Sequence, residues 1–113
     1  MRVVLLVLTL AGVLAAASEA VGTWSCAAMS PDGEAVKFVL KVQEQSGRVS
    51  ATVEDARGAT PVIDPKLDGS ILTFQVNYDG ARYKLELKFS GDQVKGACRG
   101  EQASGEVKGS RTP

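Results

Sequence analysis

The sequence predicts a small all-β domain: an antiparallel up-and-down meander of about eight strands that closes, or nearly closes, into a barrel. Two observations predict it. Apolar and polar residues alternate in one short segment after another, and turn signals containing glycine separate these segments at intervals of about ten residues. A flattened sandwich is the alternative, and the barrel is favoured because closure leaves no exposed sheet edge.

The first 20 residues have the layout of a secretory signal peptide. A basic start, Met1-Arg2, precedes an unbroken apolar run, and small residues follow it. The apolar run is about a dozen residues long, which is shorter than the roughly 20 that a membrane-spanning helix needs. We therefore expect cleavage after Ala20, with a cut after Ala17 as the close alternative. The mature domain, residues 21–113, is then secreted or periplasmic and has no membrane anchor.

The first four strands are expected over residues 22–29, 36–43, 49–54 and 60–67. In the second, Phe38 and Leu40 lie on one face and Lys41 on the other, and the third alternates in the same way. Each strand therefore has one buried face and one solvent-facing face. The fourth contains Pro61 and Pro65. Because proline cannot donate to a ladder, we expect an edge or a bulge there.

The last four strands are expected over residues 72–78, 83–89, 93–99 and 105–111. The first two of these alternate over their full length, and Asp79-Gly80 between them is among the strongest hairpin signals. Further turn signals occur at residues 31–33, 46–47, 57–58, 68–69 and 90–92. Short turns of this kind join strands that pair with their chain neighbours, which predicts the meander.

Two cysteines, Cys26 and Cys98, are expected on the first and seventh strands, both facing inward. An even number of cysteines in an oxidising compartment pairs by default, so we expect a disulfide between them. The chain-entropy description gives a link across so long a loop a stabilisation of about 4 to 5 kcal/mol.

Composition excludes several classes of function. The chain has 13 basic and 13 acidic residues and no histidine. Without histidine it lacks the commonest general base, the commonest zinc ligand and the usual partner of a serine or cysteine nucleophile. The balanced charge lacks the basic face of a nucleic-acid-binding protein. We expect no enzymatic activity, no metal site and no cofactor.

The interior of a barrel of about eight strands either fills with side chains or holds one small ligand. Many bulky residues face inward, which favours a filled core, and a ligand cavity is the alternative. The residues that would line such a cavity are Phe38, Leu40, Phe74, Tyr83 and Leu85. The Tyr83 hydroxyl would be its main polar group.

The mature chain begins with Gly22-Thr23-Trp24 and has Arg111 on its last strand. This pair of features resembles the calycins, the group of lipocalins, fatty-acid-binding proteins and avidins, in which a Gly-x-Trp motif starts the barrel and an arginine of the final strand packs over the tryptophan. The resemblance implies that Trp24 and Arg111 close one end of the barrel through a cation–π contact worth about 0.5 to 2 kcal/mol. The domain also resembles short, uncharacterised bacterial exported domains with a Gly-Thr-Trp start.

Three glycines, Gly96, Gly105 and Gly109, fall at inward positions of the last two strands. A strand interior does not favour glycine, so we expect them to make room for Trp24 or to allow a bend where the barrel closes.

These observations predict a non-catalytic, exported binding module for a small apolar molecule or an extracytoplasmic protein. One alternative is an extracytoplasmic proteinase inhibitor, since bacterial metalloproteinase inhibitors are similar small barrels whose N-terminal segment enters the enzyme cleft. A cut after Ala17 would leave residues 18–21 as such a segment. The other alternative is a partner-binding accessory domain whose contact face carries Lys37, Lys41, Lys84 and Lys88.

Overall fold

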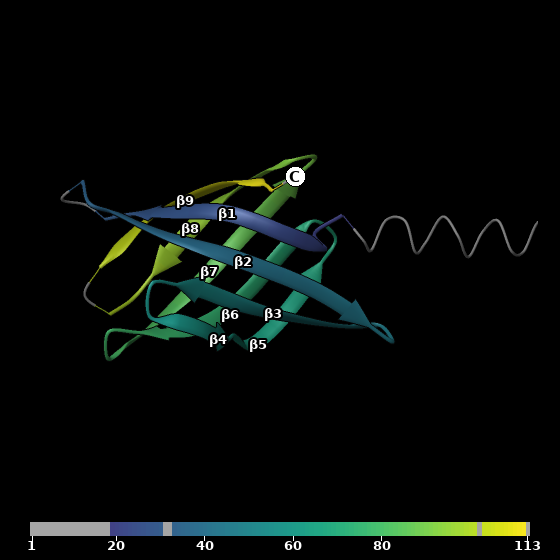
Figure 1. Ribbon diagram of the computed structural model, residues 1–113, viewed down its shortest axis with the longest axis horizontal. Coiled ribbons are helices and arrows are strands. Elements are labelled where there is room, and N and C mark those ends of the chain that lie inside the picture. The colour runs from purple at the N-terminus through teal and green to yellow at the C-terminus, as the bar shows by residue number, and fades with distance from the viewer. Residues whose placement is uncertain (1–18, 31–32, 102, 113) are drawn as a thin grey trace, which may run out of the picture.

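The computed structural model describes residues 19–30, 33–101 and 103–112. Nine antiparallel strands form one sheet that curls into a nearly closed barrel (Figure 1). The strands are β1 (Gly22–Met29), β2 (Ala35–Gln45), β3 (Arg48–Asp55), β4 (Gly58–Pro61), β5 (Ile63–Asp68), β6 (Ile71–Tyr78), β7 (Ala81–Ser90), β8 (Gln93–Arg99) and β9 (Ser104–Arg111). The predicted all-β meander is therefore confirmed. Within the described ranges, no helix has the length and apolar character needed to cross a membrane. Most of the predicted signal peptide, residues 1–18, lies outside them.

The strand order is β4-β3-β2-β1-β9-β8-β7-β6-β5. Each strand thus pairs with its neighbours in the chain, except that β4 and β5 form the two edges of the sheet and β1 pairs with β9. In that last pairing Trp24 lies opposite Arg111. The first and last strands are therefore side by side, as barrel closure requires.

The single fourth strand expected from the sequence is divided in two. Its first part, β4, pairs with β3, and its second part, β5, pairs with β6 across a register shift between Ile63 and Lys66. Asp64, with a φ of 50°, and Pro65 form this irregularity. The expected bulge is thus present, and it leaves one unsealed seam in the barrel between β4 and β5. Val62, between the two strands, extends the pairing with β3, because its amide donates to the Ala51 carbonyl at 3.0 Å.

Two-residue turns set the register of the hairpins. Ser46 and Gly47 have φ values of 53° and 78°, and Asp79 and Gly80 have values of 53° and 80°. Positive φ at both central positions is the type I′ geometry, whose twist matches that of the strands it joins. The turns therefore fix the hairpin register, so that the apolar residues of paired strands point to the same, interior side of the sheet.

The three inward glycines accommodate neighbouring backbone. A Cβ atom at Gly96 would collide with the Glu86 carbonyl of β7, and one at Gly105 with the Met29 carbonyl of β1. The nearest atoms belong to adjacent strands and not to Trp24, so the expectation of space for the indole is wrong. The backbones of β7 and β8, and those of β9 and β1, therefore approach each other unusually closely.

One half of the barrel is densely filled. The largest fully buried side chains are Trp24, Phe74, Phe89, Leu40, Leu72, Leu87, Val42, Val94 and Val107. Trp24 and Phe89 meet edge to face with ring centroids 4.8 Å apart. The indole Nε1 donates to the Ala20 carbonyl at 3.0 Å, so the polar atom of this buried ring is satisfied. We call this half, around Trp24, the closed end.

Arg111 covers the closed end. Its guanidinium lies 4.3 Å from the centre of the Trp24 ring. It also donates to the Val21 and Glu19 carbonyls, each at 2.8 Å, and to the Asp92 carboxylate at 3.3 Å. Sequence comparison with calycins implied the contact between Arg111 and Trp24. The Gly-x-Trp motif and the terminal arginine did not predict the hydrogen bonds from Arg111 to the segment before β1.

We expect Gly96→Ala to lower the free energy of unfolding by about 1 to 3 kcal/mol, because the added methyl group overpacks against the β7 backbone. Ser110→Ala, an exposed change on β9, is the control and leaves stability nearly unchanged. Urea denaturation of both variants measures the difference. Equal stability of the two variants would contradict the close strand approach.

Arg111→Lys should destabilise the fold by about 1 to 3 kcal/mol, because an ammonium cannot reproduce the forked donation to two carbonyls while lying flat on an indole. The control is Arg99→Lys, at an exposed position on β8. Thermal and chemical unfolding compare the pair, and an Arg111→Lys protein as stable as its control would rule out this role.

Candidate ligand-binding site

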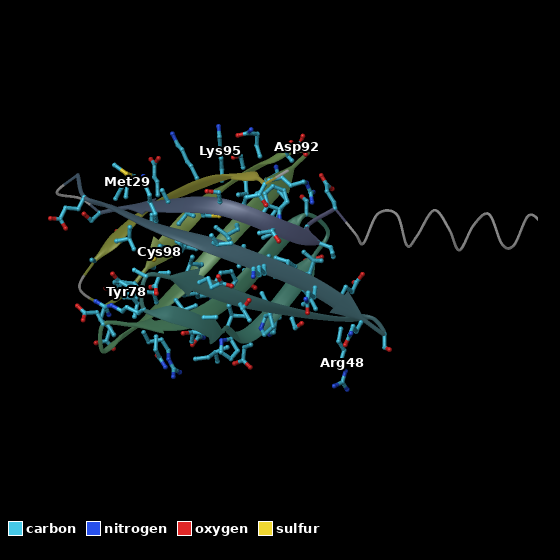
Figure 2. The ribbon with its side chains drawn as sticks, viewed as in Figure 1. Met29, Arg48, Tyr78, Asp92, Lys95 and Cys98 are labelled. Carbon is cyan, nitrogen blue, oxygen red and sulfur yellow. The ribbon has the colours of Figure 1, made fainter. Side chains whose placement is uncertain are left out.

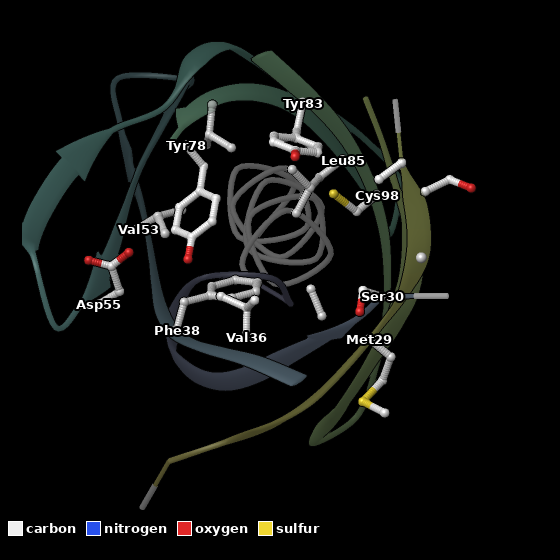
Figure 3. Close-up of a pocket in the computed structure, with 15 residues that line it drawn as sticks. Met29, Ser30, Val36, Phe38, Val53, Asp55, Tyr78, Tyr83, Leu85 and Cys98 are labelled. Carbon is white, nitrogen blue, oxygen red and sulfur yellow. The ribbon is translucent and has the colours of Figure 1, made fainter. Parts of the chain in front are cut away.

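A cavity of about 150 Å³ opens at the end of the barrel opposite Trp24, which we call the open end (Figure 3). Side chains from six strands form most of its wall. Its apolar lining consists of Ala28 from β1, Val36 and Phe38 from β2, Val53 from β3, Val76 and Tyr78 from β6, Tyr83 and Leu85 from β7, and Cys98 from β8. The interior is therefore filled at one end and hollow at the other.

The hollow follows from the sizes of the inward residues. At the closed end, β1 contributes Trp24, whereas at the open end the same face of β1 contributes Ala28. Gly105 of β9, which also lines the cavity, lies next to Cys98 in the register and has no side chain to project inward. Small residues on β1 and β9 thus leave space that the rings of the closed end do not reach.

Three of the five residues expected to line a cavity do line it: Phe38, Tyr83 and Leu85. The other two, Leu40 and Phe74, are 0% and 1% exposed and belong to the filled core. Leu40 lies opposite Trp24 in the register, one inward step deeper than Phe38. Alternation along a strand gives the face of each residue, but its depth depends on which end of the barrel is open.

Several lining residues were not assigned to the site from sequence. Tyr78 is the clearest case, because it continues the inward series of β6 after Val76. It is also the last residue before the turn, where alternation is a weaker guide. Its ring meets Tyr83 edge to face with centroids 6.5 Å apart, so two phenol rings from one hairpin form part of the cavity wall (Figure 3).

The rim also carries charge. Arg57, in the β3–β4 turn, lies with its guanidinium 4.9 Å from the centre of the Tyr78 ring and 3.6 Å from the Asp79 carboxylate. Asp55, a rim residue of the cavity, accepts a hydrogen bond from the Arg57 amide at 2.8 Å. Arg57 therefore connects the β3–β4 and β6–β7 hairpins at the open end. Because the Arg57 and Asp79 side chains are 61% and 76% exposed, this connection is weak.

The predicted disulfide between Cys26 and Cys98 is wrong: both thiols are free. The register gives the reason. Cys26 lies opposite Gly109 and Cys98 opposite Gly105, so the two cysteines are separated by the width of β9 and by four residues along it. At about 3.4 Å per residue, the offset along the strand alone is about 14 Å, and a disulfide needs Cα atoms within about 7 Å.

The two thiols are in apolar surroundings. Burial raises the pKa of Cys26 from 9.0 to about 12, and burial also raises the pKa of the half-buried Cys98. Both groups are therefore neutral thiols at physiological pH, and neutral thiols are poor nucleophiles and poor metal ligands. Among the described residues, no group of three or more acidic, cysteine or histidine side chains is placed to hold a metal ion.

The outer face of β7, β8 and β9 is predominantly basic. Lys88, Lys95 and Lys108 lie opposite one another on β7, β8 and β9, and Lys95 projects into solvent (Figure 2). Glu86 and Glu106 occupy the adjacent row of the same face. Lys84 and Arg99 pair in the row on the other side of Glu86, so these three rows carry five basic and two acidic side chains.

The four lysines proposed as a contact face lie on two separate strands, Lys37 and Lys41 on β2 and Lys84 and Lys88 on β7. Lys41 also forms an ion pair with Glu54 at 2.8 Å.

Comparison with known proteins places the chain by fold. It matches no protein family, and no curated protein matches it either. A redesigned β-barrel aligns with a TM-score of 0.63 and 19% identity, covering 87% of this chain and 96% of that one. A de novo designed fluorescence-activating β-barrel aligns with a TM-score of 0.60 and 18% identity over 86% of this chain and 97% of that one. A redesigned β-barrel bound to DFHBI aligns with a TM-score of 0.58 and 16% identity, covering 86% of this chain and 98% of that one. The fold is therefore that of a small, nearly closed antiparallel barrel.

The raised pKa of Cys26 predicts a pH dependence of stability. Well below pH 9 the thiol is protonated in both folded and unfolded chains, so its contribution to stability is fully present. As the pH rises from 9 towards 12, the unfolded chain releases this proton first, and stability falls. Urea denaturation across this range should show a smaller fall in Cys26→Ala than in the unmodified protein. Identical slopes would mean that the folded environment does not perturb this thiol.

Proposed function

We propose that this chain is an exported, non-catalytic binding module whose open-end cavity takes one small, predominantly apolar molecule. The observation that carries the proposal is a hollow of about 150 Å³ with an apolar wall at one end of an otherwise filled barrel. A domain of this size gains stability by filling its interior, and here a single end is left unfilled.

The size of the cavity limits its occupant. Apolar cavities of about 150 Å³ remain dry and bind molecules the size of benzene. The phenol rings of Tyr78 and Tyr83, with Phe38, offer edges and faces to a flat ring. Three polar lining residues, Ser30, Asp55 and Ser104, lie at the ends of strands, so a polar substituent on the ligand would face the mouth. We therefore propose a single-ring or similarly compact apolar ligand.

Similar barrels support this reading. One of the redesigned barrels that resemble this chain is bound to DFHBI, and another similar design is fluorescence-activating. A small antiparallel barrel of this form thus accommodates a ligand in at least one neighbour. The calycin-like start, Gly22-Thr23-Trp24, also fits a binding barrel, and export agrees with the arrangement of the first 20 residues.

The inhibitor alternative is less well supported. It needs a free N-terminal segment that can enter an enzyme cleft, and residues 18–21 were the candidate. The Ala20 side chain is buried, and the Glu19 and Val21 carbonyls accept hydrogen bonds from Arg111. Residues 19–21 therefore pack against the closed end of the barrel and do not form a free segment that could enter an enzyme cleft.

The test is a titration of the unlabelled small aromatics benzene and toluene, followed by backbone amide NMR shifts. We expect saturable shifts at open-end residues such as Val36 and Val53, and little change at the Trp24 indole N–H at the far end. Ala28→Phe should abolish saturation, because its ring fills the cavity from the β1 wall.

The matched control is Ala27→Phe, the same substitution on the next residue of β1, whose side chain faces outward. This variant should bind as the unmodified protein does. An unchanged Trp24 indole signal in both variants shows that the barrel is folded. Absence of saturable binding, or saturable binding that survives Ala28→Phe, would contradict the proposal.

A further inference from the structure

We propose that the leader is removed after Ala17, so that the mature domain begins at Ser18 and retains Glu19 and Ala20. The inference rests on the export proposed above, but not on the ligand. Residues 15–20 contain two sets of small residues that suit a leader-processing protease, Ala15 with Ala17 and Ser18 with Ala20. The recognition pattern does not distinguish them, whereas the contacts of the folded domain do.

Ala20 belongs to the core. Its side chain is 1% exposed, and its carbonyl accepts the hydrogen bond from the indole Nε1 of Trp24, itself fully buried. A cut after Ala20 removes this carbonyl from the domain. The indole N–H would then be buried at the closed end without its acceptor, or the end would have to open to water.

Glu19 and Val21 hold the other side of the closed end. The Arg111 guanidinium donates to both of their carbonyls while it covers Trp24. A cut after Ala20 deletes the Glu19 acceptor and turns Val21 into the N-terminal residue. Its new ammonium group would lie on the residue whose carbonyl bonds Arg111, so two positive charges would be brought together.

Gly22 shows how closely this segment is fitted. Its φ is 141°, and a Cβ atom there would lie 2.5 Å from Arg111 Nη1. The chain turns at Gly22 from the covering segment into β1, and a side chain would displace the guanidinium. The residues from Glu19 to Gly22 thus act as one cover over the closed end, and a domain that starts at Val21 lacks half of it.

The experiment is expression of the full chain in an export-competent bacterial host, followed by intact mass measurement and N-terminal sequencing of the exported protein. Two adjacent variants separate the candidate cuts. Ala17→Glu places a charge at the last leader position of the cut after Ala17, and Ser18→Glu places the same charge two residues before the end of a leader cut after Ala20. Neither changes a residue of the described cover.

We expect an N-terminus at Ser18 in the unmodified protein, unchanged processing of Ser18→Glu apart from the mass of the substitution, and loss of this product in Ala17→Glu. An N-terminus at Val21, with Ser18→Glu blocking its formation, overturns the inference and leaves export standing. A protein that keeps Met1 overturns both the inference and the export proposal. The ligand titration is unaffected by either result.

Discussion

The contact between Arg111 and Trp24 is the interaction on which the remainder of this barrel depends. It joins the last strand to the first at the point where the sheet must close. The same guanidinium fastens the chain segment before β1 over the end of the barrel through two backbone carbonyls. Because the barrel has no disulfide to connect its strands, closure relies on this side chain, on the β1–β9 ladder and on the buried rings beneath them.

The asymmetry between the two ends follows from this closure. A tryptophan that is both covered and hydrogen-bonded requires a dense surrounding layer, which Phe74, Phe89 and Leu87 provide. At the other end no residue plays the part of Trp24, and the inward positions of β1 and β9 hold alanine and glycine. Gly105 cannot simply be enlarged to fill the space, since its Cβ would collide with the β1 backbone. The hollow is therefore linked to the close approach of strands that closes the barrel.

Much of the fold could be predicted from sequence, because alternation and two-residue turns are local signals. Asp79-Gly80 and Ser46-Gly47 adopt the turn geometry that their residues favour. Local signals do not specify the register between strands that are distant in the sequence. The cysteine pairing depended on the register across β9, which separates Cys26 from Cys98 by four residues along that strand.

The candidate site shows the same division. Alternation identified the inward faces of β2, β6 and β7, and so placed Phe38, Tyr83 and Leu85 in the interior. It could not say that Leu40 and Phe74 lie below the floor of the cavity, because depth depends on the tilt and register of all the strands. Pro65 indicated that the predicted fourth strand would be irregular. The sequence could not predict that the resulting seam lies beside the cavity, because the position of the seam depends on how far β5 pairs along β6.

The seam bears on how a ligand would reach the cavity. β5 pairs with β6 only as far as Gln75, so Val76 and Tyr78, which line the cavity, lie beyond the end of this ladder. Across the gap, Val53 and Asp55 line the cavity from β3, and Arg57 reaches over to Tyr78 and Asp79. The exposed Arg57 thus bridges the β3–β4 and β6–β7 hairpins at the rim, and Val62 links β4 to β5 along the chain, whereas every other pair of neighbouring strands shares a backbone ladder. Separating an exposed ion pair costs little, and separating a ladder costs many hydrogen bonds. We therefore expect the rim to open more readily at Arg57, next to the cavity, than at Arg111, where the β1–β9 ladder and the filled core hold the closed end together.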